Sequence, residues 1–74
     1  MTPDFVARRV PPATTKRTKK IPDGQLPMYM DTVLMNMGQA LDAWRFSSGP
    51  ADAVAEAIDA LTALWVEIET RGLA

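Results

Sequence analysis

The side chains of this chain that could carry chemistry are its carboxylates, several of which recur at helical spacing. Asp52, Glu56 and Asp59 lie three and four residues apart, and Asp31 and Asp42 belong to a second segment with helical periodicity. We expect all five to face solvent, because they fall outside the main apolar stripes of their segments. Hard cations need several converging oxygen ligands, and no complementary ligand set accompanies these residues. The sequence therefore predicts no metal site.

The residue types that most enzymes depend on are absent. The 74 residues include no histidine and no cysteine. This absence removes the commonest general base, the usual nucleophile pairings, thiolate metal sites and disulfides. The four glycines are scattered and do not form a phosphate-binding loop. We expect a non-enzymatic protein without a cofactor or a small-molecule substrate.

Charge is distributed unevenly along the chain. Residues 1–20 hold six basic residues and one acid, whereas residues 21–74 hold two basic residues and eight acids. A basic arm on an acidic body favours two roles in one chain. The densest group, hereafter the basic cluster, consists of Lys16, Arg17, Lys19 and Lys20. It could contact phosphates or an acidic protein surface. We favour a solvated arm or an acidic protein over nucleic acid, because no aromatic residue is interleaved for base stacking.

Residues 1–26 form the arm, which we expect to be extended or disordered. Its prolines interrupt regular helices, and the run TTKRTKK offers nothing apolar to bury. A small group of apolar and basic residues could dock into a groove or add a strand to a partner sheet. These residues are Phe5, Val6, Arg8, Arg9 and Val10. The alternative is a loose tail whose few hydrophobic residues are incidental.

Two amphipathic helices are predicted after the arm, over residues 28–46 and 50–71. Gly49-Pro50 and Arg71-Gly72 are typical start and stop signals for the second helix. The run Ser47-Ser48-Gly49 permits only a tight reversal, so the helices should be antiparallel neighbours. Their apolar stripes are Met30, Val33, Leu34, Met37, Leu41 and Trp44 in the first, and Val54, Ile58, Leu61, Leu64, Trp65 and Ile68 in the second.

Three further apolar residues of the first helix lie off its stripe. Met28, Met35 and Phe46 could form a second patch suited to a partner, since methionine packs adaptably. They could equally be ordinary exposed hydrophobic residues.

These features predict an all-α fold: an antiparallel two-helix hairpin over residues 27–74 with an extended N-terminal arm. A core this small rarely supplies more than about 3–5 kcal/mol. We therefore expect the two stripes to be completed to a four-helix bundle, by dimerisation or by a partner protein. The leading hypothesis is a protein–protein interaction or assembly subunit. Its layout is similar to that of small structural or adaptor proteins of bacteriophage particles, an analogy of layout alone.

Two alternatives remain open. One is a nucleic-acid accessory protein that grips phosphates with its basic arm. The other is a small acidic inhibitor or regulator of another protein. No apolar run is long enough to span a bilayer, and residues 1–10 do not form a signal peptide. We therefore expect the protein in the cytoplasm or within a macromolecular assembly, neither secreted nor in a membrane.

Overall fold

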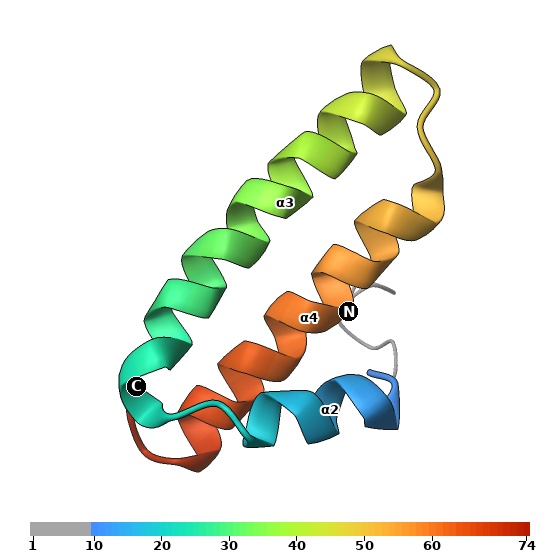
Figure 1. Cartoon of the computed structure of the whole chain (residues 1–74). Coiled ribbons are helices and arrows are strands. Elements are labelled where there is room, and N and C mark those ends of the chain that lie inside the picture. The colour runs from blue at the N-terminus through green and yellow to red at the C-terminus, as the bar shows by residue number, and fades with distance from the viewer. Residues whose placement is uncertain (1–9) are drawn as a thin grey trace, which may run out of the picture.

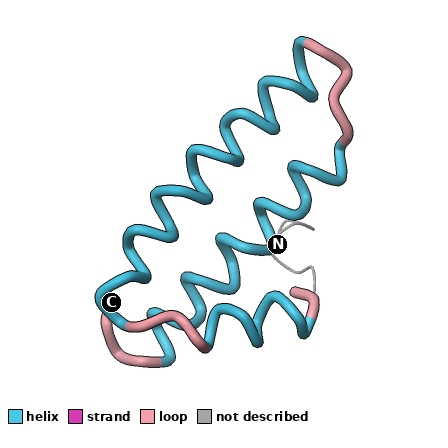
Figure 2. Tube along the Cα trace, in the orientation of Figure 1, coloured by secondary structure: helices cyan, strands magenta, loops and turns pink. Residues whose placement is uncertain are grey.

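The computed structural model describes residues 10–74, and within this range it is all-helical (Figures 1 and 2). Helix α2 spans Pro12–Lys19 and leads through the short 3-10 helix η1, Asp23–Gln25, into helix α3, Leu26–Phe46. Helix α4 spans Ala51–Thr70. No helix in the described part of the chain is long and apolar enough to cross a membrane.

Helices α3 and α4 pack against each other as an antiparallel hairpin, as the sequence predicts (Figure 1). Helix α3 begins two residues earlier than expected, because Pro27 falls in its first turn, where the missing N–H removes no helical hydrogen bond. The connection between the helices turns tightly. Gly49 N donates to Ala43 O at 2.8 Å, and a Cβ on Gly49 would lie only 2.9 Å from that of Ala43. A residue without a side chain is therefore required at this position.

Residues 12–19 are helical, which corrects the prediction of an extended or disordered segment. Pro12 lies at the start of α2, where proline is compatible with a helix. Within the helix, the Thr18 hydroxyl donates to Thr14 O at 2.9 Å. Thr18 is also buried, and α2 packs against α4 (Figure 1). Tertiary packing thus stabilises a helix that lacks an apolar stripe of its own.

The described hydrophobic core lies at the end of the hairpin away from the α3–α4 turn. Leu26, Leu64 and Ile68 are its buried members, and Ile21, Met30 and Val33 pack around them. The first residue of α3 therefore meets the last turns of α4. Ile21, which follows α2, packs against the core at this end. The end near the turn has no comparable cluster among the described residues.

Candidate interaction surface

One side of the hairpin exposes apolar side chains from both long helices. Near the α3–α4 turn, Leu41 and Trp44 of α3 line a groove of about 220 Å³ together with Val54 and Ile58 of α4. Leu34 shares a helix side with Leu41, and Trp65 shares one with Ile58, because each pair is seven residues apart. We call this surface the open face. It comprises Leu34, Leu41, Trp44, Val54, Ile58 and Trp65.

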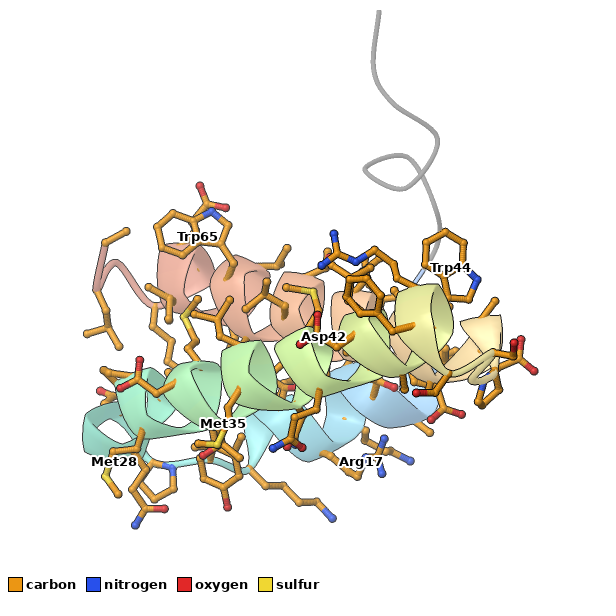
Figure 3. All side chains as sticks on the ribbon, turned by 90° about the horizontal axis from the view of Figure 1, so that it is seen from above. Arg17, Met28, Met35, Asp42, Trp44 and Trp65 are labelled. Carbon is orange, nitrogen blue, oxygen red and sulfur yellow. The ribbon has the colours of Figure 1, made fainter. Side chains whose placement is uncertain are left out.

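Helix α2 lies on the other side of the hairpin from the open face. Figure 3 shows Trp44 and Trp65 projecting from one side, whereas Arg17 of α2 lies on the opposite side. The two tryptophans are 50% and 47% exposed, and Leu34 is 46% exposed. The other members are half-buried. The described part of the chain therefore leaves apolar side chains of both long helices exposed on this side.

The predicted interface residues divide between the open face and the interior of the chain. Leu64 and Ile68 are buried in the core, with Met30 and Val33 packed against them. These four side chains make contacts within the chain, and their role at an interface with a partner stays a prediction. Met37 and Leu61 are half-buried and belong to the α3–α4 hairpin. The sequence could not separate the two sets, because one continuous stripe serves both neighbours.

Charged groups lie beside the open face rather than in its centre. Arg45, near the turn end of α3, donates from Nη2 to Asp42 Oδ1 at 3.3 Å. Its guanidinium carbon also lies 4.9 Å from the ring centroid of Phe46. Asp31, toward the other end of α3, is exposed. The long helix therefore has a cation near one end and an anion near the other.

The side of α4 beneath α2 is polar. Asp59 is buried, at 6% exposure, which corrects the prediction that this carboxylate faces solvent. A groove of about 340 Å³ lies between the two helices and is lined by Thr14 and Arg17 of α2 and by Glu56 and Asp59 of α4. All four residues of the basic cluster are exposed. Basic residues of α2 thus lie above acidic residues of α4.

Arg71, at the end of α4, forms hydrogen bonds with the residues at the end of α2 and just after it. Its Nη1 donates to Ile21 O and to Asp23 Oδ1, both at 2.7 Å, and its Nη2 donates to Lys19 O at 3.1 Å. Its Nε donates to Glu67 Oε2 at 2.8 Å. The hydrogen bonds to Glu67 and then to Asp23 raise the pKa of Arg71 above its ordinary value. The sequence predicts only a cation that ends a helix. The acceptors on Lys19, Ile21 and Asp23 lie about fifty residues away, and no local signal indicates them.

The remaining predicted site residues belong to the N-terminal arm. Phe5, Val6, Arg8 and Arg9 are outside the described residues, so their docking role stays a prediction. Val10 is half-buried and lines a groove along α2 with Pro12, Ala13, Thr15, Lys16 and Lys19.

The proposed second patch is exposed but not gathered on the open face. Met28, Met35 and Phe46 are 65%, 61% and 75% exposed. Figure 3 shows Met28 and Met35 on the side of the hairpin away from the two tryptophans. Their role as a separate contact surface stays a prediction.

The described residues contain no cluster suited to a metal ion, and no related protein identifies a functional site. Within residues 10–74, no group of three or more acidic, histidine or cysteine side chains is placed to hold a metal ion. Comparison of the chain with known protein families, curated proteins and solved structures finds no match. The open face is the candidate interaction surface in the described part of the chain.

Proposed function

We propose that this protein is a non-enzymatic assembly subunit that works by burying the open face of its hairpin against protein, either other copies of itself or a different chain. Its role is to contribute two long helices to a larger helical bundle. The polar side of α4, covered by α2, faces outward in such an assembly.

The observation that carries this proposal is the pairing of a small core with a wide exposed apolar surface. Among the described residues, the buried apolar side chains are Leu26, Ala63, Leu64 and Ile68. Two half-exposed tryptophans and a half-exposed leucine lie on the open face. Contiguous apolar surface of this kind typically marks a protein contact site. Aromatic residues, tryptophan above all, are also the side chains most often responsible for binding energy at protein interfaces.

Light scattering on the full chain at low and high salt tests the proposal. We expect an oligomer whose molar mass is independent of salt, because apolar burial is screened far less than surface charge. Leu34→Asp should dissociate it, since the carboxylate would have to enter the interface. Met35→Asp is the matched control, because Met35 is also exposed on α3 but lies on the other side of the hairpin.

If the chain is monomeric, its helical circular dichroism signal decides whether the proposal stands. A monomer with weak helicity supports the proposal, because it shows that the open face must be covered by a different protein before the hairpin is stable. A chain that is still monomeric at the highest concentration tested, and is nevertheless fully helical and unfolds cooperatively, would overturn it. So would an oligomer that Met35→Asp dissociates and Leu34→Asp does not.

A further inference from the structure

We infer that residues 1–9 of this chain, which precede the described residues, dock onto the side of the hairpin that carries α2, with Phe5 in a groove between α3 and α4. The groove has a volume of about 310 Å³. Alanines form most of its lining, namely Ala40 on α3 and Ala53, Ala57 and Ala60 on α4. We call it the alanine groove. The inference does not rest on the proposed function, because α2 and the open face lie on opposite sides of the hairpin.

The alanine groove is a part of this side that α2 leaves uncovered. Helix α2 has eight residues, and the groove that it forms with α4 includes Glu56, Asp59 and Ala60. Ala53 lies seven residues before Ala60, about 10.5 Å nearer the α3–α4 turn. Alanine side chains are short, so the space between the two long helices accepts a bulky side chain from another segment, as a hole accepts a knob.

The described chain begins beside this groove. Pro11 lines the groove between α2 and α4 together with Glu56 and Ala60, and these two residues also line the alanine groove. The backbone of Pro11 is extended, with φ −57° and ψ 139°, and a residue that precedes a proline is itself restricted to extended conformations. Phe5 lies six residues before Pro11, a distance that an extended chain spans in about 20 Å. The whole alanine groove is therefore within reach of Phe5.

The first described side chains indicate which residues of the segment face α4. Pro11 shares a groove with residues of α4, whereas Val10 lines a groove with described residues of α2 only. Side chains of an extended chain alternate between two sides. Continued in this form, Arg9 and Phe5 face α4 together with Pro11, and Val6 faces away. Phe5 is also the one aromatic residue among residues 1–26, so its burial contributes most to docking.

The acids on this side of α4 complement the charge of the segment. Asp52 and Glu56 are four residues apart, so they share one side of the helix, and both are exposed. Neither forms an ion pair with another described residue. Arg8 and Arg9 lie between Pro11 and Phe5 in the sequence, so the docked segment carries them past these carboxylates. Charge complementarity therefore favours this basic segment as the occupant of the groove.

An engineered disulfide in the full chain tests the docking. The natural chain contains no cysteine. Ala7→Cys, which leaves Phe5 and Arg9 in place, is combined with Ala53→Cys in the alanine groove. The matched control combines Ala7→Cys with Ala55→Cys, two residues farther along α4 and in the groove of the open face.

The quantity measured is the equilibrium between the two thiols and the intramolecular disulfide in a glutathione redox buffer. We expect it to favour the disulfide at least about tenfold more for Ala53→Cys than for Ala55→Cys, because docking raises the effective concentration of one thiol near the other. Mass spectrometry of the alkylated monomer gives the ratio, and circular dichroism checks that each reduced variant is as helical as the wild type.

Stability gives a second reading that requires no cysteine. Phe5→Ala should lower the folded-to-unfolded ratio about tenfold, because a docked phenylalanine loses buried apolar area. Val6→Ala is the matched control and should lower the ratio less than about twofold, since Val6 faces away from α4. Urea unfolding followed by circular dichroism, at a concentration where the chain is monomeric, measures both variants.

The outcomes separate this inference from the proposed function. Equal disulfide formation by the two cysteine pairs overturns the docking and leaves the open face unaffected. A disulfide between copies, seen as a covalent dimer on a non-reducing gel, also overturns it, because the segment then occupies the groove of another chain. If the cysteine variants fail to fold, equal effects of Phe5→Ala and Val6→Ala overturn the docking instead. Failure of the proposed function would appear in the light-scattering experiment on the wild-type chain and would change neither comparison.

Discussion

Replacing Leu26 with alanine should nearly abolish the stability of the isolated hairpin. Leu26 is 0% exposed and belongs to the small core with Leu64 and Ile68. The substitution removes three carbons, which at about 0.8 kcal/mol each amounts to about 2.4 kcal/mol of lost burial. The cavity left behind raises the total to about 3–4 kcal/mol. This is close to the whole free energy of unfolding expected for a domain of this size, about 3–5 kcal/mol. The folded-to-unfolded ratio should therefore fall more than about a hundredfold.

Leu34→Ala makes the same chemical change on the open face and serves as the matched control. Because Leu34 is 46% exposed, its loss should cost only about 1 kcal/mol in dilute solution. Urea unfolding followed by circular dichroism, at a concentration where the chain is monomeric, measures both variants. Equal costs for Leu26→Ala and Leu34→Ala would refute the placement of the core. At concentrations where copies associate, the cost of Leu34→Ala should grow, because association stabilises only the folded chain.

Four further predictions concern the polar contacts and the basic cluster. Arg71→Lys should speed amide hydrogen exchange over residues 18–23, because one ammonium cannot reproduce the geometry of the guanidinium; unchanged exchange would show that Arg71 does not fasten α2. Because the pKa of Arg71 is raised in the folded chain, its contribution to the free energy of unfolding is fully present below the ordinary arginine pKa and is lost only above the raised one. This contribution should therefore stay constant in urea titrations from neutral pH to about pH 9. Asp59→Ala should lower the free energy of unfolding by roughly 1–3 kcal/mol in the same assay. The control, Asp52→Ala at an exposed position, should lower it by less than about 1 kcal/mol. Similar values for the two variants would mean that the burial of Asp59 does not affect stability. Alanine at all four positions of the basic cluster should leave the molar mass by light scattering unchanged, and wild-type binding to a DNA duplex should be weak and fall steeply with salt; tight, salt-resistant DNA binding would favour the nucleic-acid alternative.

The two long helices could be predicted closely because their signals are local. The three-and-four spacing of apolar residues gives α3 and α4, and Gly49-Pro50 and Gly72 define the limits of the second. The shortness of the turn gives the antiparallel arrangement. Completion to a four-helix bundle stays a prediction, because it depends on contacts beyond this chain.

The missed features all depend on contacts between distant segments. Helix α2 has no apolar stripe, so no periodicity in PATTKRTK indicates it. Its prolines read as helix breakers, although Pro12 lies where a helix tolerates proline. Asp59 has the same spacing as exposed acids and differs from them only because α2 packs over its side of α4. Arg71 bonds to the backbone of Lys19 and Ile21, which a sequence pattern cannot encode.

Part of the charge difference between the two halves of the chain has a counterpart in the described structure. The sequence alone favours separate roles for a basic arm and an acidic body. Instead, α2 lies on α4, where Arg17 shares a groove with Glu56 and Asp59. A polyanion that bound the basic cluster would approach these acids and be repelled by them. The apolar open face, on the other side of the hairpin, has no such competing interaction within the described chain. The charge pattern therefore favours a structural role for α2, which packs on α4. The open face is a stronger candidate for binding a protein partner than the basic cluster is.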